Sequence, residues 1–458
     1  MTVSQLAPPV LDRSALVERY VRTRERTRQL FDLIDPAAYY SRPISLRNPI
    51  VFYEGHLPAF SIIAFINRGL GRPGVDDALE RLFARGIDPE SDATAVPRSG
   101  ASTAWPSRET VLAFGRQADE LVVAALRDAA FDPSRPAMRR YEAIFTALEH
   151  EAMHQETLLY MWHRLPGEQK RHVDAPQGVP RLLPDRAYET AGDPPRSSPV
   201  RIPAGAATLG ADRDAGAFGW DNEFERAIVE VPAFEIDAHS VTNAEFLRFL
   251  EAGGYERRDF WTEDGWAWRS SESVEHPAFW VRKGERWFWR GMFEDIPLPA
   301  SWPVYVSQAE AAAFARSRGR RLPTEAEFHR AAFGTPEGGE REFPWGSEPP
   351  DATRGNFDFA SWEPVPAGSR PAGASAWGVH DLIGNGWEWT STVFEPFPGF
   401  EPMASYPEYS ADFFDGGHYV MKGASQATAK ELVRRSFRNW FRPNYPYVYA
   451  KFRTAATE

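Results

Sequence analysis

Two histidines one helical turn apart form the sharpest chemical feature of this 458-residue sequence. His150 and His154 stand in the run HEAMH, within a stretch whose apolar residues recur at helical spacing. Residues four apart on a helix share one face, so both imidazoles can reach a single metal ion. A helix with two half-exposed histidines and no bound ion is the plainer alternative. The pair therefore indicates a metal site, to be weighed against that alternative.

A third histidine upstream is a candidate to complete this site. His56 stands in the run FYEGHLPAF, at the start of a predicted helix over 57–70. Its neighbours are apolar, so a single buried core histidine is the alternative. Three histidine ligands leave open positions on a metal, and imidazole-rich sites suit iron, zinc or copper.

The same run also matches the HExxH motif of zinc peptidases. In that interpretation Glu151 is the general base, and a third ligand comes from a later helix. No His or Glu follows at the extended zincin spacing, and the predicted helix runs instead into Gly167 and a proline-rich stretch. A zinc peptidase is therefore the weaker of the two metal hypotheses.

Four long amphipathic segments would position these histidines. Their apolar residues recur every three or four positions, which predicts α-helices assembled as a bundle. The predicted helices span residues 14–34, 57–70, 107–130 and 136–165. A long loop over 71–106 should wrap the bundle or contact the next domain.

The composition changes after the bundle. We expect a helical bundle over 1–166, a linker rich in Pro, Arg, Asp and Ser over 167–200, and a second domain over 201–458. The second domain consists of short apolar runs broken by Gly, Pro and Asn, which predicts a loop-rich α+β fold. Its clearest helices are expected at 242–252 and 308–317. The fold class is thus multidomain, α followed by α+β.

The composition excludes several functions. The chain has no cysteine, which removes disulfides, Cys-ligated zinc, iron–sulfur clusters and thiolate nucleophiles. The net charge of −12 is spread along the chain and argues against nucleic-acid or anionic-membrane partners. The sequence shows no signal peptide and no membrane span, so we expect a cytoplasmic protein. Sixteen tryptophans exceed what the core needs and indicate a binding surface.

Four ordered motifs in the second domain carry a family resemblance. They are residues 241–246 (VTNAEF), 321–328 (RLPTEAEF), 384–390 (GNGWEWT) and 435–440 (RSFRNW). They resemble the signatures of the formylglycine-generating-enzyme, or sulfatase-modifying-factor, fold, a variant of the C-type-lectin fold. Enzymes of that class work through active-site cysteines. The absence of cysteine therefore excludes formylglycine generation.

Together with the helical bundle, the whole chain resembles the ergothioneine-type sulfoxide synthases. In that family a DinB-like four-helix bundle precedes the sulfatase-modifying-factor-like domain. The resemblance implies that His56, His150 and His154 hold non-haem iron(II). It also implies an oxygen-dependent reaction that joins a sulfur donor to the imidazole carbon of hercynine, the trimethylated form of histidine.

The resemblance further implies a substrate pocket. Asn439 and Trp440 match the family positions near the trimethylammonium group, and aromatic faces suit a quaternary ammonium. A core aromatic is the alternative for Trp440. The family also uses a tyrosine as proton donor near the iron. Tyr406 and Tyr409 are the candidates here.

Departures from the family pattern bear on the donor. Members that use γ-glutamylcysteine have Asp and Arg where this chain has Phe441 and Tyr445, on either side of Arg442. Aromatics in place of an anion-binding Arg imply a donor with fewer carboxylates and a sugar-like face. Met153 stands where the sulfur enzymes commonly have Gln, which removes a hydrogen bond to the substrate.

These departures favour the selenoneine synthase branch of the family. The main hypothesis is an Fe(II) enzyme that uses dioxygen to join the selenium of a selenosugar to hercynine. The first alternative is a sulfoxide synthase that takes sulfur from cysteine or γ-glutamylcysteine. A zinc peptidase and a non-catalytic binding module with a lectin-like fold are more distant alternatives.

Overall fold

The computed structural model describes residues 11–84, 105–171, 180–184, 188–190, 192–195, 198–215 and 218–457. The chain forms two compact units. The first comprises residues 1–182, 213–220 and 401–409, and the second comprises residues 183–212, 221–400 and 410–458. Parts of the expected 71–106 loop and 167–200 linker lie outside the described residues. The segments 213–220 and 401–409, although they come after the bundle in the sequence, belong to the first unit.

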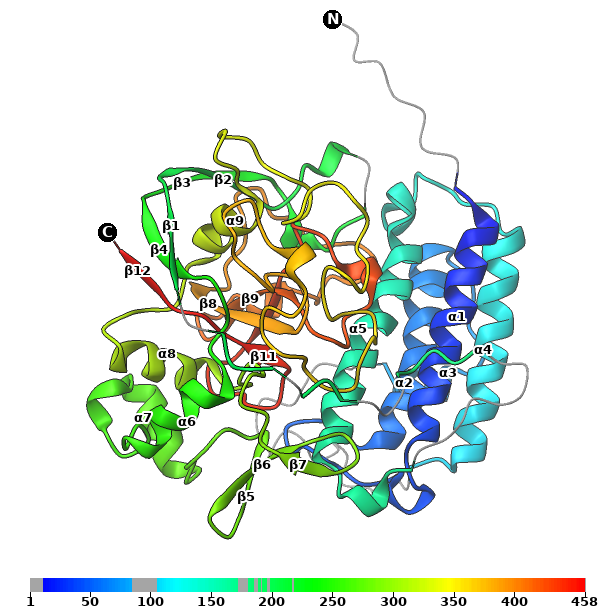
Figure 1. The fold of residues 1–458 in the computed structure, drawn as a ribbon. Helices are drawn as coiled ribbons and strands as arrows, with labels where there is room; N and C mark the ends of the chain where they lie inside the picture. Colours follow the sequence, from blue (N-terminus) through cyan, green and yellow to red (C-terminus); the bar gives the residue numbers. More distant parts are fainter. Residues whose placement is uncertain are drawn as a thin grey trace, which may run out of the picture. The chain divides into compact units, whose positions relative to one another are not determined.

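The first unit contains the four-helix bundle. Its long helices are α1 (Arg13–Asp32), α2 (Ile50–Ser61), α4 (Arg108–Asp128) and α5 (Glu142–Arg164). Helices α1 and α2 each pack against both α4 and α5, as Figure 1 shows. A short helix, α3 (Asp77–Leu82), packs on α2. The expected multidomain α and α+β fold is confirmed in this unit and the next.

Helix α2 begins earlier than the sequence predicted. It starts at Ile50 and continues beyond Ser61 as a π-helix over Ile62–Gly69, so His56 lies in mid-helix and not at its start. Every residue of α2 is buried, so no alternation of polar and apolar residues marks its first turns. Pro58 is also unfavourable inside a helix, which made a start near residue 57 the natural prediction.

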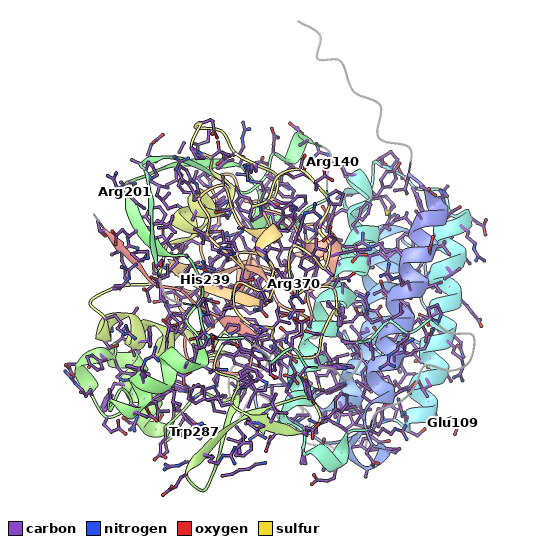
Figure 2. The ribbon with its side chains drawn as sticks, viewed as in Figure 1. Glu109, Arg140, Arg201, His239, Trp287 and Arg370 are labelled. Carbon is purple, nitrogen blue, oxygen red and sulfur yellow. The ribbon has the colours of Figure 1, made fainter. Side chains whose placement is uncertain are left out.

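Helix α5 begins later than predicted. Residues Pro136–Tyr141 form a 3-10 turn in which Arg140 and Tyr141 have positive φ angles of 54° and 60°. This kink separates the turn from α5, because a right-handed helix cannot pass through left-handed residues. Arg140, labelled in Figure 2, donates a hydrogen bond to Asp214 at 2.6 Å, a contact within the helical unit.

The continuous helical stretch Ile50–Gly69 is long and apolar enough to cross a membrane by length and composition. However, 89% of the apolar 18-residue window within that stretch is buried inside the fold. The stretch is therefore accounted for as the core helix of the bundle, which needs an apolar surface all round.

Over its described residues, the second unit combines short strands with four α-helices. Its sheets have the strand orders β1–β4–β12, β10–β9–β8–β11, β2–β3 and β5–β6–β7. The strands are β1 (Pro199–Ile202), β2 (Gly205–Leu209), β3 (Ala227–Val231), β4 (Phe234–Asp237), β5 (Trp280–Lys283), β6 (Arg286–Arg290), β7 (Asp295–Pro297), β8 (Gly386–Val393), β9 (Tyr419–Ala424), β10 (Asn439–Phe441), β11 (Ala450–Lys451) and β12 (Ala455–Thr457). Strand β9 pairs antiparallel with β8 and β10, whereas β11 runs parallel to β8. These small sheets leave much of the chain in loops.

Two of the four helices in this unit match the sequence predictions. They are α6 (Asn243–Glu251) and α8 (Gln308–Ser317). The other two, α7 (Glu263–Ser271) and α9 (Glu325–Phe333), were not predicted. Thr324 and Glu327 form a capping box at the start of α9, and this local signal could have revealed the helix.

The motifs of the second unit build its core. Glu388 of β8 forms a fully buried ion pair with Arg453, with nitrogen–oxygen distances of 2.5 and 2.9 Å. Glu325 at the start of α9 pairs with Arg438 at 3.0 Å, also out of solvent. A buried ion pair whose partner is removed leaves an uncompensated charge, so these motif residues are structurally required.

Candidate functional site

The structure brings His56, His150 and His154 together. His56 comes from α2 and the other two come from α5, and one ligand nitrogen from each lies within 4.8 Å of the others. The ring centroids are 4.4 to 5.1 Å apart. His56 is fully buried and His150 is 3% exposed, while His154 is half-buried. The three rings can therefore converge on one small ion.

The ring nitrogens suit a metal ion. Nδ1 of His56 lies 2.7 Å from the carbonyl oxygen of Phe83, so this nitrogen carries the proton and Nε2 keeps its lone pair. Nε2 of His56 and Nδ1 of both His150 and His154 are buried with no hydrogen-bond partner among the described residues. Leaving buried polar atoms without a partner is costly, and a bound cation would give such nitrogens one.

The protonation state of the cluster favours metal binding. Burial lowers the pKa of His56 to about 4. Burial also lowers the pKa of His150 and of His154 well below the usual value, and the neighbouring histidines lower both further. All three are therefore neutral near pH 7, the form in which imidazole ligates a metal.

Glu151 does not join this cluster. Its buried carboxylate accepts hydrogen bonds from Arg24 Nη1 at 2.9 Å and from Thr27 Oγ1 at 2.6 Å, both on α1. Arg24 also pairs with Asp119 of α4 at 2.8 Å. A carboxylate bound to α1 is not available to activate a water on the histidine cluster. The geometry therefore argues against the zinc-peptidase hypothesis.

The segment 401–409 carries both candidate tyrosines. The ring of Tyr406 lies 6.0 Å from that of His150 and 4.9 Å from that of Phe60. The hydroxyl of Tyr409 donates a hydrogen bond to Met153 Sδ at 3.3 Å. Both tyrosines therefore lie beside α5, which carries His150 and His154, and they contact different residues.

Backbone and side-chain hydrogen bonds hold this segment in the helical unit. The backbone N–H and the hydroxyl of Ser405 each lie 2.8 Å from the Glu142 carboxylate. The same hydroxyl lies 2.8 Å from the hydroxyl of Thr146, and Arg68 donates to the Ser405 carbonyl at 2.9 Å. The residues bound to Ser405 come from α5 and the π-helix, so the tyrosines are fixed relative to the histidine cluster.

Sequence reasoning missed two aromatic neighbours of the site. Phe60 stacks on His150 with ring centroids 3.4 Å apart. It follows His56 by four residues, a helical spacing that could have placed it on the same face. The ring of Trp220 lies 4.0 Å from that of Tyr409 at an interplanar angle of 31°, and its indole N–H donates to Glu149 at 3.0 Å. No local signal connects Trp220 to α5, because the two are far apart in the sequence.

The other predicted substrate residues belong to the second unit. Strand β10 consists of Asn439, Trp440 and Phe441, and the ring of Trp440 stacks on Phe394 at 4.3 Å. The Oδ1 atom of Asn439 accepts a hydrogen bond from the Trp440 backbone N–H at 2.9 Å. Trp440 is also 5.6 Å from Phe413, centroid to centroid. An aromatic cluster thus surrounds Trp440.

The residues that replace the family's Asp and Arg stack on each other. The rings of Phe441 and Tyr445 lie 5.0 Å apart at an interplanar angle of 18°. Arg442 between them is half-exposed and pairs with Asp415 at 3.1 Å. Asp415 therefore occupies one donor nitrogen of this arginine.

Fold and site together define a class of protein, a helical bundle with three histidines combined with a loop-rich α+β unit. Comparisons with known families agree with this class. The sulfatase-modifying factor enzyme 1-like domain family matches residues 186–458, and the DinB superfamily matches residues 19–158.

Known proteins match the chain over nearly all of its length or over about half of it. The hercynine oxygenase of Mycolicibacterium thermoresistibile is 34% identical over 97% of this chain and 95% of its own. Ergothioneine biosynthesis protein 1 of Neurospora crassa is 29% identical over 89% of this chain and 54% of its own. The formylglycine-generating enzyme of Mycobacterium tuberculosis is 32% identical over 52% of this chain and 89% of its own. The chain therefore belongs to the hercynine oxygenase family of ergothioneine-type enzymes.

Proposed function

We propose that this chain is an Fe(II)- and oxygen-dependent enzyme that joins a chalcogen donor to the imidazole carbon of hercynine. The observation that carries the proposal is the buried cluster of His56, His150 and His154, whose ligand nitrogens lie within 4.8 Å of one another. Its relative of 34% identity, which matches almost end to end, is a hercynine oxygenase.

The three histidines would hold the iron, which supplies the activation of dioxygen. Three neutral protein ligands leave further coordination positions, so the reactants can be brought together at one centre. Phe60 stacks on His150 and Phe52 stacks on His56 at 5.1 Å, which restricts the orientation of both rings. The chain would therefore hold the histidine rings in fixed orientations within apolar surroundings before the iron binds.

The remaining site residues would bind substrate and move a proton. The aromatic cluster around Trp440 suits the trimethylammonium group of hercynine, with Asn439 as a neighbouring polar group. Tyr406 and Tyr409 are the proposed proton donors, because both lie in the segment held beside α5. Their two hydroxyls can be told apart by substitution with phenylalanine, one at a time.

The comparisons favour a sulfur donor over the selenosugar expected from the sequence. The relatives are named for hercynine oxygenation and for ergothioneine biosynthesis. We therefore propose cysteine or γ-glutamylcysteine as the first donor to test. In either case the substrates are small molecules: hercynine, the donor and dioxygen.

One observation keeps the selenosugar as a second candidate. Phe441 and Tyr445 form a stacked aromatic pair, and Arg442 between them already donates a hydrogen bond to Asp415. Aromatic surfaces suit a sugar face, whereas a donor carboxylate needs an unpaired arginine fork. Met153, which lacks the amide of glutamine, adds to the same argument.

A competition assay distinguishes the donors. The enzyme is purified without oxygen and loaded with Fe(II). It is then mixed with hercynine, oxygen and one of three donors: cysteine, γ-glutamylcysteine or a selenosugar. The products are identified by mass spectrometry. A sulfoxide product with either thiol supports the sulfur reaction, and exclusive turnover of the selenosugar supports the second candidate. His56→Ala should lose bound iron. Oxygen consumption in none of the three mixtures would reject the proposed function.

A further inference from the structure

Methionine is the only source of protein sulfur in this chain, because it has seven methionines and no cysteine. Five of them are at most 4% exposed, and Met1 lies outside the described residues. The five buried ones are Met138, Met161, Met292, Met403 and Met421. Among the described residues, Met153 is therefore the one methionine with a partly exposed side chain. Oxidation of thioethers follows exposure, which singles out Met153.

The surroundings of Met153 point to the same residue. It lies on α5 directly before His154 and three residues after His150, so it shares the helix region that presents the metal ligands. The hydroxyl of Tyr409 donates to its sulfur at 3.3 Å. The ring of Tyr409 in turn contacts that of the fully buried Trp220, with centroids 4.0 Å apart. The thioether is thus held beside the histidine cluster.

We propose that Met153 is a site at which this enzyme is oxidised to methionine sulfoxide by peroxide. A lone pair of the sulfur attacks one peroxide oxygen, the oxygen–oxygen bond breaks and a sulfur–oxygen bond forms. The sulfur loses two electrons, and the second oxygen of hydrogen peroxide leaves as water. This step needs no metal. Only the source of peroxide, incomplete oxygen reduction at the histidine cluster, rests on the proposed function.

The position of Tyr409 would stabilise the product. A sulfoxide oxygen is a polar acceptor, whereas a thioether sulfur accepts hydrogen bonds weakly. The Tyr409 hydroxyl already points at the sulfur and needs only a small adjustment to bind the new oxygen. Oxidation would therefore tighten the Tyr409 contact and replace an apolar group beside the ligands with a polar one.

The first test uses metal-free, folded, full-length protein and hydrogen peroxide. Peptides from timed samples are analysed by mass spectrometry for the gain of one oxygen. Met153 should oxidise at least about tenfold faster than Met161 on the same helix and Met403 on the tyrosine segment, because both of these are buried. In urea-unfolded protein the rates should become similar. Equal rates in the folded protein would overturn the proposal.

Met153→Leu is the matched variant, since leucine is apolar, similar in size and not oxidisable. Peptides from folded Met153→Leu protein should show no rapid gain of an oxygen atom when the protein is treated with hydrogen peroxide in the same way. An unchanged rapid phase would place the oxidation elsewhere and overturn the assignment.

A second arm tests the peroxide source. Fe(II)-loaded protein in air, without donor, should gain one oxygen at Met153, and His150→Ala protein treated alike should not. If added peroxide oxidises Met153 quickly but Fe(II)-loaded protein in air does not, Met153 remains the oxidation site. The iron chemistry would then no longer be the proposed source of peroxide. The two failures are therefore distinguishable.

Discussion

Neighbouring residues on α5 have opposite tasks because about 100° of helix rotation separates them. His150 joins the buried histidine cluster, while Glu151 is bound to α1 through Arg24 and Thr27. The carboxylate that a peptidase would use as a base therefore has a structural role, because it connects α5 to α1 by hydrogen bonds. It holds α5, and with it two of the three histidines, against the rest of the bundle.

Replacing Glu151 by Ala should lower the free energy of unfolding by about 3 kcal/mol, because it leaves the buried Arg24 and Thr27 groups without this partner. Urea denaturation followed by circular dichroism measures the change. Asp259→Ala is the control, since Asp259 forms an exposed ion pair with Arg257. The control should leave the unfolding midpoint unchanged. Similar effects of both substitutions would contradict the assigned role of Glu151.

Helix α2 depends on a close approach between its backbone and Phe83. A Cβ atom at Gly55 would lie only 2.4 Å from the Phe83 ring. The same Phe83 provides the carbonyl that accepts from His56 Nδ1. The missing side chain at residue 55 thus allows the contact that orients the neighbouring His56 ring, which is a reason for glycine in the middle of a helix.

Gly55→Ala should therefore weaken binding of Fe(II) and lower the thermal midpoint, because the methyl group displaces Phe83 and loosens the His56 hydrogen bond. Metal titration and thermal unfolding measure the two effects.

Gly115→Ala on α4 provides a control for the glycine substitution itself. The nearest atom to its new Cβ would be Arg24 Nη2 at 3.7 Å, an ordinary contact. Alanine favours the helix over glycine, so this variant should be as stable as the parent or more stable by up to about 1 kcal/mol. Loss of metal affinity in both variants would show that the Phe83 contact is not the cause.

For the molecule as a whole, both units bury charged side chains, and those of the second unit include two lysines, Lys422 and Lys451. Lys422 donates hydrogen bonds to two carbonyls, and Lys451 lies 3.6 Å from the buried Glu388 carboxylate. Burial lowers the pKa of both lysines to about 8, although nearby carboxylates partly oppose the effect. Each buried ammonium therefore costs stability as long as it stays protonated.

Stability should rise with pH from about 8 to 10. In that range the folded lysines release their protons while the unfolded lysines, with a pKa near 10.5, keep theirs. The unfolded state then binds more protons, so the free energy of unfolding increases by about 1 kcal/mol per pH unit for each lysine. Urea denaturation at several pH values measures the slope. Lys422→Met should reduce it, and a stability that falls over this range would contradict the argument.

The sequence by itself determined the features that depend on local spacing or on composition. The pairing of His150 with His154, the helices α1 and α4, the four motifs of the second unit and the exclusion of cysteine chemistry are of this kind, since helical period and residue type can be seen within short windows. The resemblance built on those motifs led to the family that the comparisons show.

Only the tertiary structure decided which distant segments meet. It placed His56 in mid-helix against the other two histidines, bound Glu151 to α1, and brought Tyr409 and Trp220 next to each other beside α5. These contacts depend on how buried surfaces pack, and a fully buried helix such as α2 has no polar face to show its limits. Periodicity in the sequence reports which face of an element is buried, but not which partner covers it.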